Sequence, residues 1–139
     1  MRRDLSRLRS WRARLGRYLA VEAGRPFAWG ESDCVLFAAG AVEAMTGVDP
    51  AAPWRGRYRT ERGAWRVLRR AGFRDHLEAA AAVLPQIPAG AAREGDLAVV
   101  GEGREATIGI IVRDHVVCRA DTGVRLVSRR QASRAFRCG

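Results

Sequence analysis

The sequence contains no lysine and no asparagine, so all 25 of its basic residues are arginines. It has only two histidines, three cysteines and 15 acidic residues, and its formal net charge is +10. No segment approaches the roughly 18–20 consecutive apolar residues of a transmembrane helix, and the arginine-rich start lacks the apolar region of a secretory signal. We therefore expect no membrane span, and a protein that is made and kept in a reducing cytoplasm unless it leaves inside a larger particle.

The positive charge is more informative than the residue type that carries it. Abundant alanine and glycine beside missing lysine and asparagine are typical of a GC-rich genome, which explains the use of arginine. The charge itself attracts nucleic acid, anionic lipid or an acidic protein surface.

The three cysteines, Cys34, Cys118 and Cys138, are odd in number and include no Cys-x-x-Cys pair. This pattern favours neither a disulfide framework nor a zinc site of the usual spacing, so we expect no metal and no cofactor. A single Cys34–Cys118 bridge and a metal site shared with another chain remain alternatives. The default expectation is three reduced thiols, at least two of them buried as small apolar residues.

The length of 139 residues and the apolar fraction of 47% suit one domain over residues 1–139. Apolar periodicity and capping residues predict four helices, at about 4–23, 32–46, 60–72 and 75–85. Short Val- and Ile-rich segments predict an antiparallel meander, with strands at 97–100, 107–112, 115–118 and 124–127 and a last short strand at 135–138. The prediction is an α+β fold whose helical part, about 1–88, packs on one face of a sheet part, about 94–139.

The first expected helix alternates leucines with arginines. We interpret it as a packing helix with a solvated arginine face; the alternative is a basic helix that lies on phosphate or lipid head groups.

Cys34 stands in the first turn of the second expected helix, directly after Ser32 and Asp33, which are both good N-caps. The partial positive charge and the free N–H groups of a helix N-terminus stabilise a thiolate. A cysteine nucleophile needs this arrangement, so Cys34 is the candidate nucleophile.

Three segments of the chain resemble NlpC-like, papain-type cell-wall peptidases. Residues 27–34 (Phe-Ala-Trp-Gly-Glu-Ser-Asp-Cys) resemble their Trp-Gly…Asp-Cys signature, and residues 94–97 (Glu-Gly-Asp-Leu) resemble the Gly-Asp-Leu that opens their first sheet strand. Residues 107–110 (Thr-Ile-Gly-Ile) are similar to their His-Val-Gly-Ile strand. The resemblance implies a papain-like fold in which the cysteine opens a helix packed on an antiparallel sheet.

More closely, the whole chain resembles a family of short phage-encoded proteins found beside tail genes. The resemblance rests on residues 29–34, on residues 46–50 (Thr-Gly-Val-Asp-Pro) and on residues 56–58 (Gly-Arg-Tyr), in that order. It implies a virion protein in the tail tip of a siphophage or gene-transfer particle, made in the bacterial host cytoplasm. The implied partners are other tail-tip proteins, such as hub and distal tail proteins.

The chain departs from the peptidases at Thr107, which occupies the position of their catalytic histidine. Threonine has no titratable group near neutral pH, so it cannot take a proton from Cys34. The orienting residue would fall near Cys118 or Arg119, and neither is the usual His, Asn or Gln. We expect His76 and His115 to be surface residues.

These residues predict a structural pseudo-enzyme of the cysteine-peptidase type. The alternative is an active cysteine peptidase or amidase that cuts peptidoglycan during genome entry, with Cys34 as nucleophile and a base not yet identified.

Arginines and aromatic residues alternate after the second expected helix. The candidate interface consists of Trp54, Arg55, Arg57, Tyr58, Arg59 and Arg66, and Arg62, Arg69 and Arg70 extend it. We interpret these residues as a contact with neighbouring tail proteins, since Arg and Trp are enriched at interface hot spots. A second alternative is a basic protein that binds the DNA passing through the tail non-specifically, gripping phosphates and stacking bases.

Overall fold

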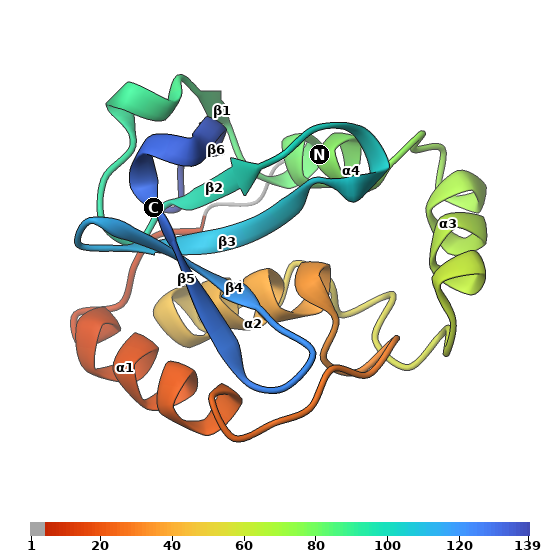
Figure 1. Ribbon diagram of the computed structural model, residues 1–139, viewed down its shortest axis with the longest axis horizontal. Helices are drawn as coiled ribbons and strands as arrows, with labels where there is room; N and C mark the ends of the chain where they lie inside the picture. Colours follow the sequence, from red (N-terminus) through yellow and green to blue (C-terminus); the bar gives the residue numbers. More distant parts are fainter. Residues whose placement is uncertain (1–4) are drawn as a thin grey trace.

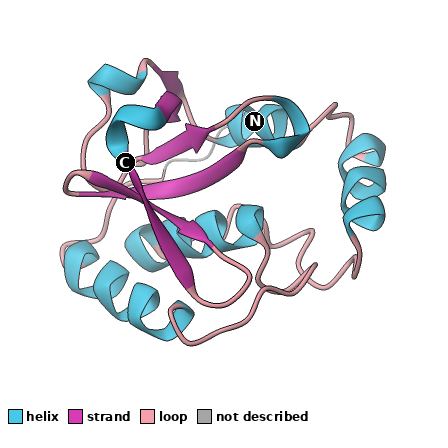
Figure 2. Cartoon of the chain, viewed as in Figure 1, coloured by secondary structure: helices cyan, strands magenta, loops and turns pink. Residues whose placement is uncertain are grey.

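The computed structural model of the protein describes residues 5–139, and within them four helices precede a six-stranded sheet. The helices are α1 (Trp11–Glu22), α2 (Cys34–Thr46), α3 (Glu61–Arg70) and α4 (His76–Val83) (Figure 1). The strands are β1 (Gln86–Ile87), β2 (Leu97–Val100), β3 (Thr107–Val112), β4 (His115–Arg119), β5 (Val124–Ser128) and β6 (Ala132–Phe136) (Figure 2). The fold is therefore α+β, as the sequence predicts.

The sheet is antiparallel, with strand order β1-β6-β2-β3-β4-β5. Strands β2 to β5 form the predicted meander. β6 crosses back to pair with the far side of β2, where Ala98 lies opposite Ala135, and β1 pairs with β6. The last strand thus covers 132–136 rather than 135–138, and β1 was not expected, because a two-residue strand has no periodic pattern and exists only through its distant partner.

The main core lies between the sheet and helices α1 and α2. Helix α2 packs on β3 and β4, and α1 lies beside α2 (Figure 1). Phe37 and Met45 of α2 meet Ile110 of β3 and Phe136 of β6 in this core, and all four are fully buried. This arrangement fixes the N-terminus of α2, where Cys34 stands, against the first residue of β3.

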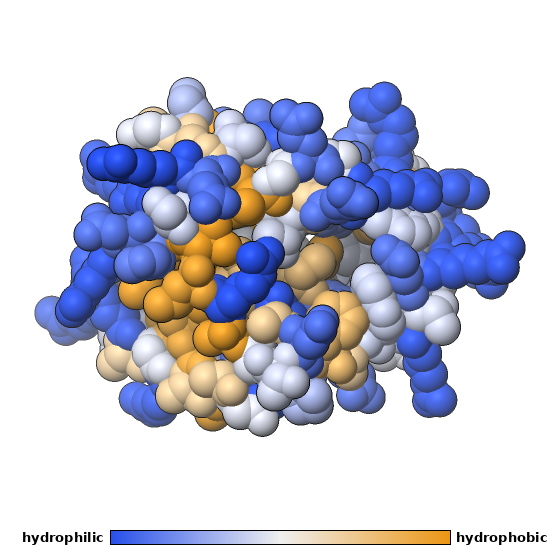
Figure 3. All heavy atoms as spheres, in the orientation of Figure 1, coloured by the Kyte–Doolittle hydropathy of each residue, from blue (hydrophilic) through white to orange (hydrophobic). Residues whose placement is uncertain are grey.

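The opposite face of the sheet carries a second, smaller apolar cluster. Its members lie on β2, β3, β4, β5 and β6 and include Ile111, Val116 and Val127. None of the four α-helices covers this face in the view of Figure 1, and Figure 3 shows apolar side chains gathered over these strands. The helices therefore pack on one face of the sheet, as predicted.

Helix α1 begins at Trp11, so the prediction of a helix over about 4–23 is wrong at its start. Position 4 lies outside the described residues, and residues 5–8 are not helical. Leu5 is buried in the core from this non-helical segment, and the Leu8 N–H donates to the Met45 carbonyl over 2.8 Å. These contacts hold the segment alongside α2. The spacing of its apolar residues is like that of a helix, but the segment is not helical. None of the helices within residues 5–139 has the length and apolar character required to cross a membrane.

Candidate thiol site at the start of helix α2

Asp33 fixes the start of α2, one residue before Cys34. One carboxylate oxygen accepts the Leu36 N–H (2.9 Å), which is the N-cap bond that the sequence predicts. The other oxygen accepts the Gly30 N–H (3.0 Å) and the Tyr58 hydroxyl (2.6 Å). The fully buried Asp33 thus joins the helix, the preceding turn and the loop around Tyr58 into one unit.

Gly30 lets two of the sequence motifs meet. Its φ is +80°, and a Cβ on it would lie 1.8 Å from the Tyr58 carbonyl oxygen, which no side chain tolerates. Its own carbonyl accepts the Gly56 N–H over 2.8 Å. The Trp-Gly and Gly-x-Tyr motifs therefore contact each other through their backbones, in the turn that precedes Cys34.

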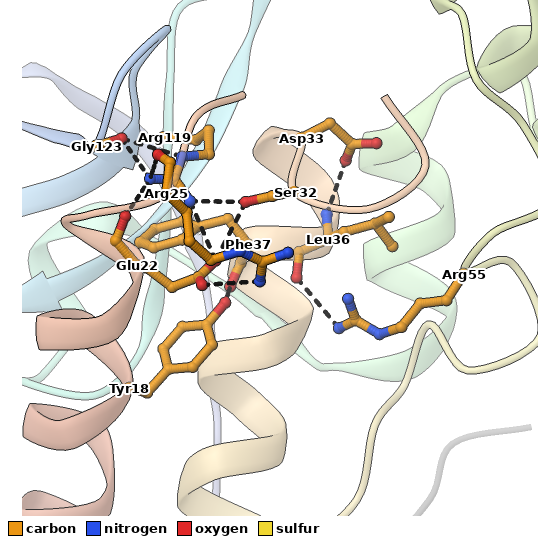
Figure 4. A network of polar contacts seen from close by, with 10 residues as sticks. All are labelled: Tyr18, Glu22, Arg25, Ser32, Asp33, Leu36, Phe37, Arg55, Arg119 and Gly123. Atoms are coloured by element: carbon orange, nitrogen blue, oxygen red, sulfur yellow. Dashed lines mark hydrogen bonds and ion pairs between the residues drawn. The ribbon is translucent and has the colours of Figure 1, made fainter. Parts of the chain in front are cut away.

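A buried arginine ties the same turn to the sheet (Figure 4). Arg119, at the end of β4, donates to the Ser32 hydroxyl (2.7 Å) and to the Glu22 carboxylate (3.1 Å) at the end of α1. It also donates through Nε to the Gly123 carbonyl (3.0 Å), and its guanidinium lies over the Phe37 ring. Arg119 therefore holds the start of α2 in place through Ser32 and Phe37, and within residues 5–139 it makes no hydrogen bond to Thr107.

A small cavity opens in front of Cys34. Its volume is about 70 Å³, and its walls are mostly aromatic and aliphatic. Trp29, Tyr58 and Trp65 line it together with Cys34 and His76. The cavity brings residues of α2, α3, α4 and the intervening loops around the sulfur.

Thr107, the first residue of β3, contacts Cys34. Its side chain is hydrogen-bonded to the Cys34 sulfur, as are backbone N–H groups of the helix start, and these contacts favour the thiolate. Burial and, next, the negative charge of Asp33 outweigh them and raise the pKa of the Cys34 thiol to about 11. The helix N-terminus therefore does not lower the pKa of Cys34 below its ordinary value, because burial beside a carboxylate opposes ionisation more strongly.

His76 is buried, contrary to the expectation of a surface residue. Its Nε2 donates to the Ala106 carbonyl over 2.6 Å, and its ring packs edge-on against Trp65. This bond assigns the proton to Nε2 and leaves Nδ1 as an acceptor, which is buried and has no hydrogen-bond partner. Its position depends on the contact between Trp65 of α3 and the start of α4, which no local sequence pattern indicates. His115 is exposed at the start of β4, as expected, and does not line the cavity.

The structure divides the candidate interface. Arg55 is an internal contact, since it pairs with Asp49 (2.5 Å) and donates to the Leu36 carbonyl (3.2 Å). Tyr58 lines the thiol cavity, and Trp54 is half-buried with its ring edge-on to Phe73.

The other three members, Arg57, Arg59 and Arg66, are exposed. Their side chains have no hydrogen bond or ion pair to any residue from 5 to 139, so they are the members left available to a partner. The two aromatic residues among the candidates are half-buried against other parts of the protein.

All three cysteines are free thiols, and Cys118 and Cys138 are buried, which confirms the prediction that at least two are buried. Across residues 5–139, no cluster of three or more His, Cys, Asp and Glu side chains is arranged to hold a metal ion.

Comparison with known proteins gives a single family. No curated protein and no solved structure matches the chain. One family model matches residues 6–138, almost the whole chain and every element of the site. The chain therefore belongs to the family described as a domain of unknown function (DUF6950).

Proposed function

We propose that this protein is a structural subunit of the tail tip of a phage or gene-transfer particle, built on a cell-wall-peptidase fold that has lost its catalytic base. The tail-tip assignment rests on the resemblance of residues 29–34, 46–50 and 56–58 to phage proteins encoded beside tail genes. The loss of catalysis rests on one observation: a threonine hydroxyl, from Thr107, meets the Cys34 sulfur where a peptidase needs an imidazole.

The chemistry of the thiol supports this proposal. With a pKa of about 11, about 10⁻⁴ of Cys34 is thiolate at pH 7, against a few per cent for an ordinary cysteine. A positioned general base contributes typically 10²–10⁴-fold to the rate, and the Thr107 hydroxyl cannot supply it. A site with neither a thiolate nor a base is poorly suited to cleave an amide.

In this role the protein is made in the bacterial host cytoplasm and incorporated into the virion beside hub and distal tail proteins. Its exposed arginines face those partners. Binding to peptidoglycan without cleavage is compatible with the same position at the tail tip.

The decisive experiment compares particles that carry the wild-type chain with particles that carry Cys34→Ala. We expect the protein in purified particles at a fixed copy number, and infectivity that the substitution changes less than about twofold. A protein absent from particles would refute the structural role. Intact Cys34→Ala particles that no longer deliver their genome would show that the thiol is needed.

A second candidate function is an active cysteine hydrolase, and His76 is the observation that favours it. His76 lines the same cavity as Cys34 and has an unpartnered Nδ1. In this alternative, Nδ1 takes the thiol proton, while the Ala106 carbonyl holds the ring in the required tautomer.

Incubation with purified peptidoglycan separates the two candidates. The structural proposal expects no release of fragments by the wild-type chain above the level of Cys34→Ala. Release that is lost in both Cys34→Ala and His76→Gln would establish the hydrolase instead.

A further inference from the structure

A groove between α3 and the connection from β2 to β3 is the feature that the proposed function does not yet use. Its volume is about 340 Å³, and it is lined by Arg62, Trp65, Arg66, Arg69 and Arg104. We propose that this groove binds an acidic, extended peptide segment of a partner protein. The inference rests on the proposed function and names the chemistry of the partner at one surface.

The arginines of the groove come from two facing elements. Arg62, Arg66 and Arg69 follow one another at four- and three-residue steps, so they lie on one face of α3. Arg104, in the short 3₁₀ turn Gly103–Glu105 before β3, closes the groove from the other side. Helix α3 stands at the edge of the molecule in Figure 1, and hydrophilic side chains crowd that edge in Figure 3.

Within residues 5–139, these four positive charges have no acidic partner. No carboxylate lines the groove, and none of the four arginines has an ion pair or a hydrogen bond to a residue within 5–139. Arginines elsewhere do have such partners: Arg7 pairs with Asp96, and Arg119 pairs with Glu22. Neighbouring like charges repel, so an anionic ligand that pairs with several of them at once is favoured.

The state of Trp65 favours a peptide over single-stranded nucleic acid. Arg104 lies over its ring at 4.8 Å from the centroid, and its edge packs against His76. One face of the ring that would have to stack on a base is therefore already covered by Arg104, and base stacking supplies much of the affinity for single strands.

The spacing of the arginines also suits an extended peptide. Arg62 and Arg66 are about 6 Å apart along the helix axis, from a rise of 1.5 Å per residue. Alternate side chains of an extended strand, which point the same way, are separated by about 6.6 Å. Acidic residues at alternate positions would therefore meet successive arginines.

The groove lies next to the cavity in front of Cys34, because Trp65 and Arg104 line both. The cavity is small and has apolar walls. The segment that fits has alternating acidic residues for the groove and an apolar residue at the end that lies beside the cavity.

The test measures fluorescence anisotropy with a labelled peptide of alternating Glu and Ala residues that ends in Val, at about 150 mM salt. The groove variant is Arg66→Gln with Arg69→Gln. The matched control is Arg9→Gln with Arg17→Gln, two exposed arginines outside the groove, which removes the same charge. We expect at least tenfold weaker binding in the groove variant, less than threefold in the control, and at least tenfold weaker binding of a peptide in which Gln replaces Glu.

Three results would overturn the inference. The first is that the peptide does not bind the wild-type protein. The second is that both variant pairs weaken peptide binding equally, which means that only net charge matters. The third is that the groove variant alone loses affinity for a labelled single-stranded DNA while its affinity for the peptide is unchanged. If the peptide does not bind but the protein is present in particles, only this inference fails. If the peptide binds but the protein is absent from particles, the proposed function fails.

Discussion

At the scale of single residues, the environment of Cys34 decides its chemistry. The sequence correctly indicates a cysteine at the N-terminus of a helix, which by itself lowers a thiol pKa. Burial beside Asp33 reverses this effect, and the sequence cannot show it, because the cavity walls come from α3, α4 and a loop more than twenty residues away. The Thr107 position, expected from the resemblance, does meet the sulfur.

Alkylation of Cys34 tests the thiol directly. In a background of Cys118→Ala and Cys138→Ala, we expect the iodoacetamide rate to be slow at pH 7 and to rise with pH towards a midpoint near 11, as the raised pKa requires. Adding Thr107→Arg supplies a partner that stays cationic over this pH range and should lower the midpoint by at least one unit; Thr107→Gln, which brings no charge, should not. A wild-type midpoint below pH 8 would contradict the assignment.

At the scale of elements, the helix starts were predictable because their signals are local. Asp33, Thr60 and Asp75 each accept an N–H of the following turn, as their side chains predict. Asp75 and Glu78 have the sequence spacing of a capping box, but Glu78 accepts the N–H of Arg74 rather than that of Asp75. Local sequence patterns therefore predict where a helix starts. Which backbone N–H each capping side chain accepts depends on the conformation of the preceding residues.

The junction of α1, α2 and β4 depends on Arg119, which no local pattern indicates. Arg119→Met should lower the free energy of unfolding by about 3 kcal/mol, because Glu22 then stays buried with only Arg25 as a charged partner. Combining it with Glu22→Gln should restore part of this loss, since no buried carboxylate remains.

Urea unfolding measures both effects. The matched control is Arg125→Met on the adjacent β5, an exposed arginine, which should change stability by less than about 0.5 kcal/mol. An Arg119→Met variant as stable as this control would show that the buried ion pair has no structural role.

At the scale of the whole molecule, buried acidic groups predict how stability depends on pH. Burial raises the pKa of Cys34 and of Cys138 to about 11, and it also raises the pKa of Cys118, Tyr18 and Tyr58. The folded protein therefore keeps protons that the unfolded chain releases above about pH 8.5. Its stability is fully present below that pH and falls as the pH rises towards 11.

Denaturant unfolding between pH 7 and 10.5, under reducing conditions, should show this decline. The fully buried Cys138 contributes about 2–3 kcal/mol of it when complete, from a shift of about two pKa units. Cys138→Ala should flatten the profile by about that amount. Stability that does not change from pH 8 to 10.5 would contradict the burial of these groups as ionisable acids.

Short-range periodicity, caps and turns were enough to predict the α+β class, the meander from β2 to β5 and the cysteine that opens α2. The return of β6 to β2, the burial of His76 at the thiol cavity and the internal contact of Arg55 follow from the three-dimensional packing alone. The same holds for the groove at which Arg62, Arg66, Arg69 and Arg104 have no ion pair to any residue from 5 to 139. Burial, desolvation and charge pairing depend on which distant segments of the chain contact each other, and the spacing of residues along the chain does not predict those contacts.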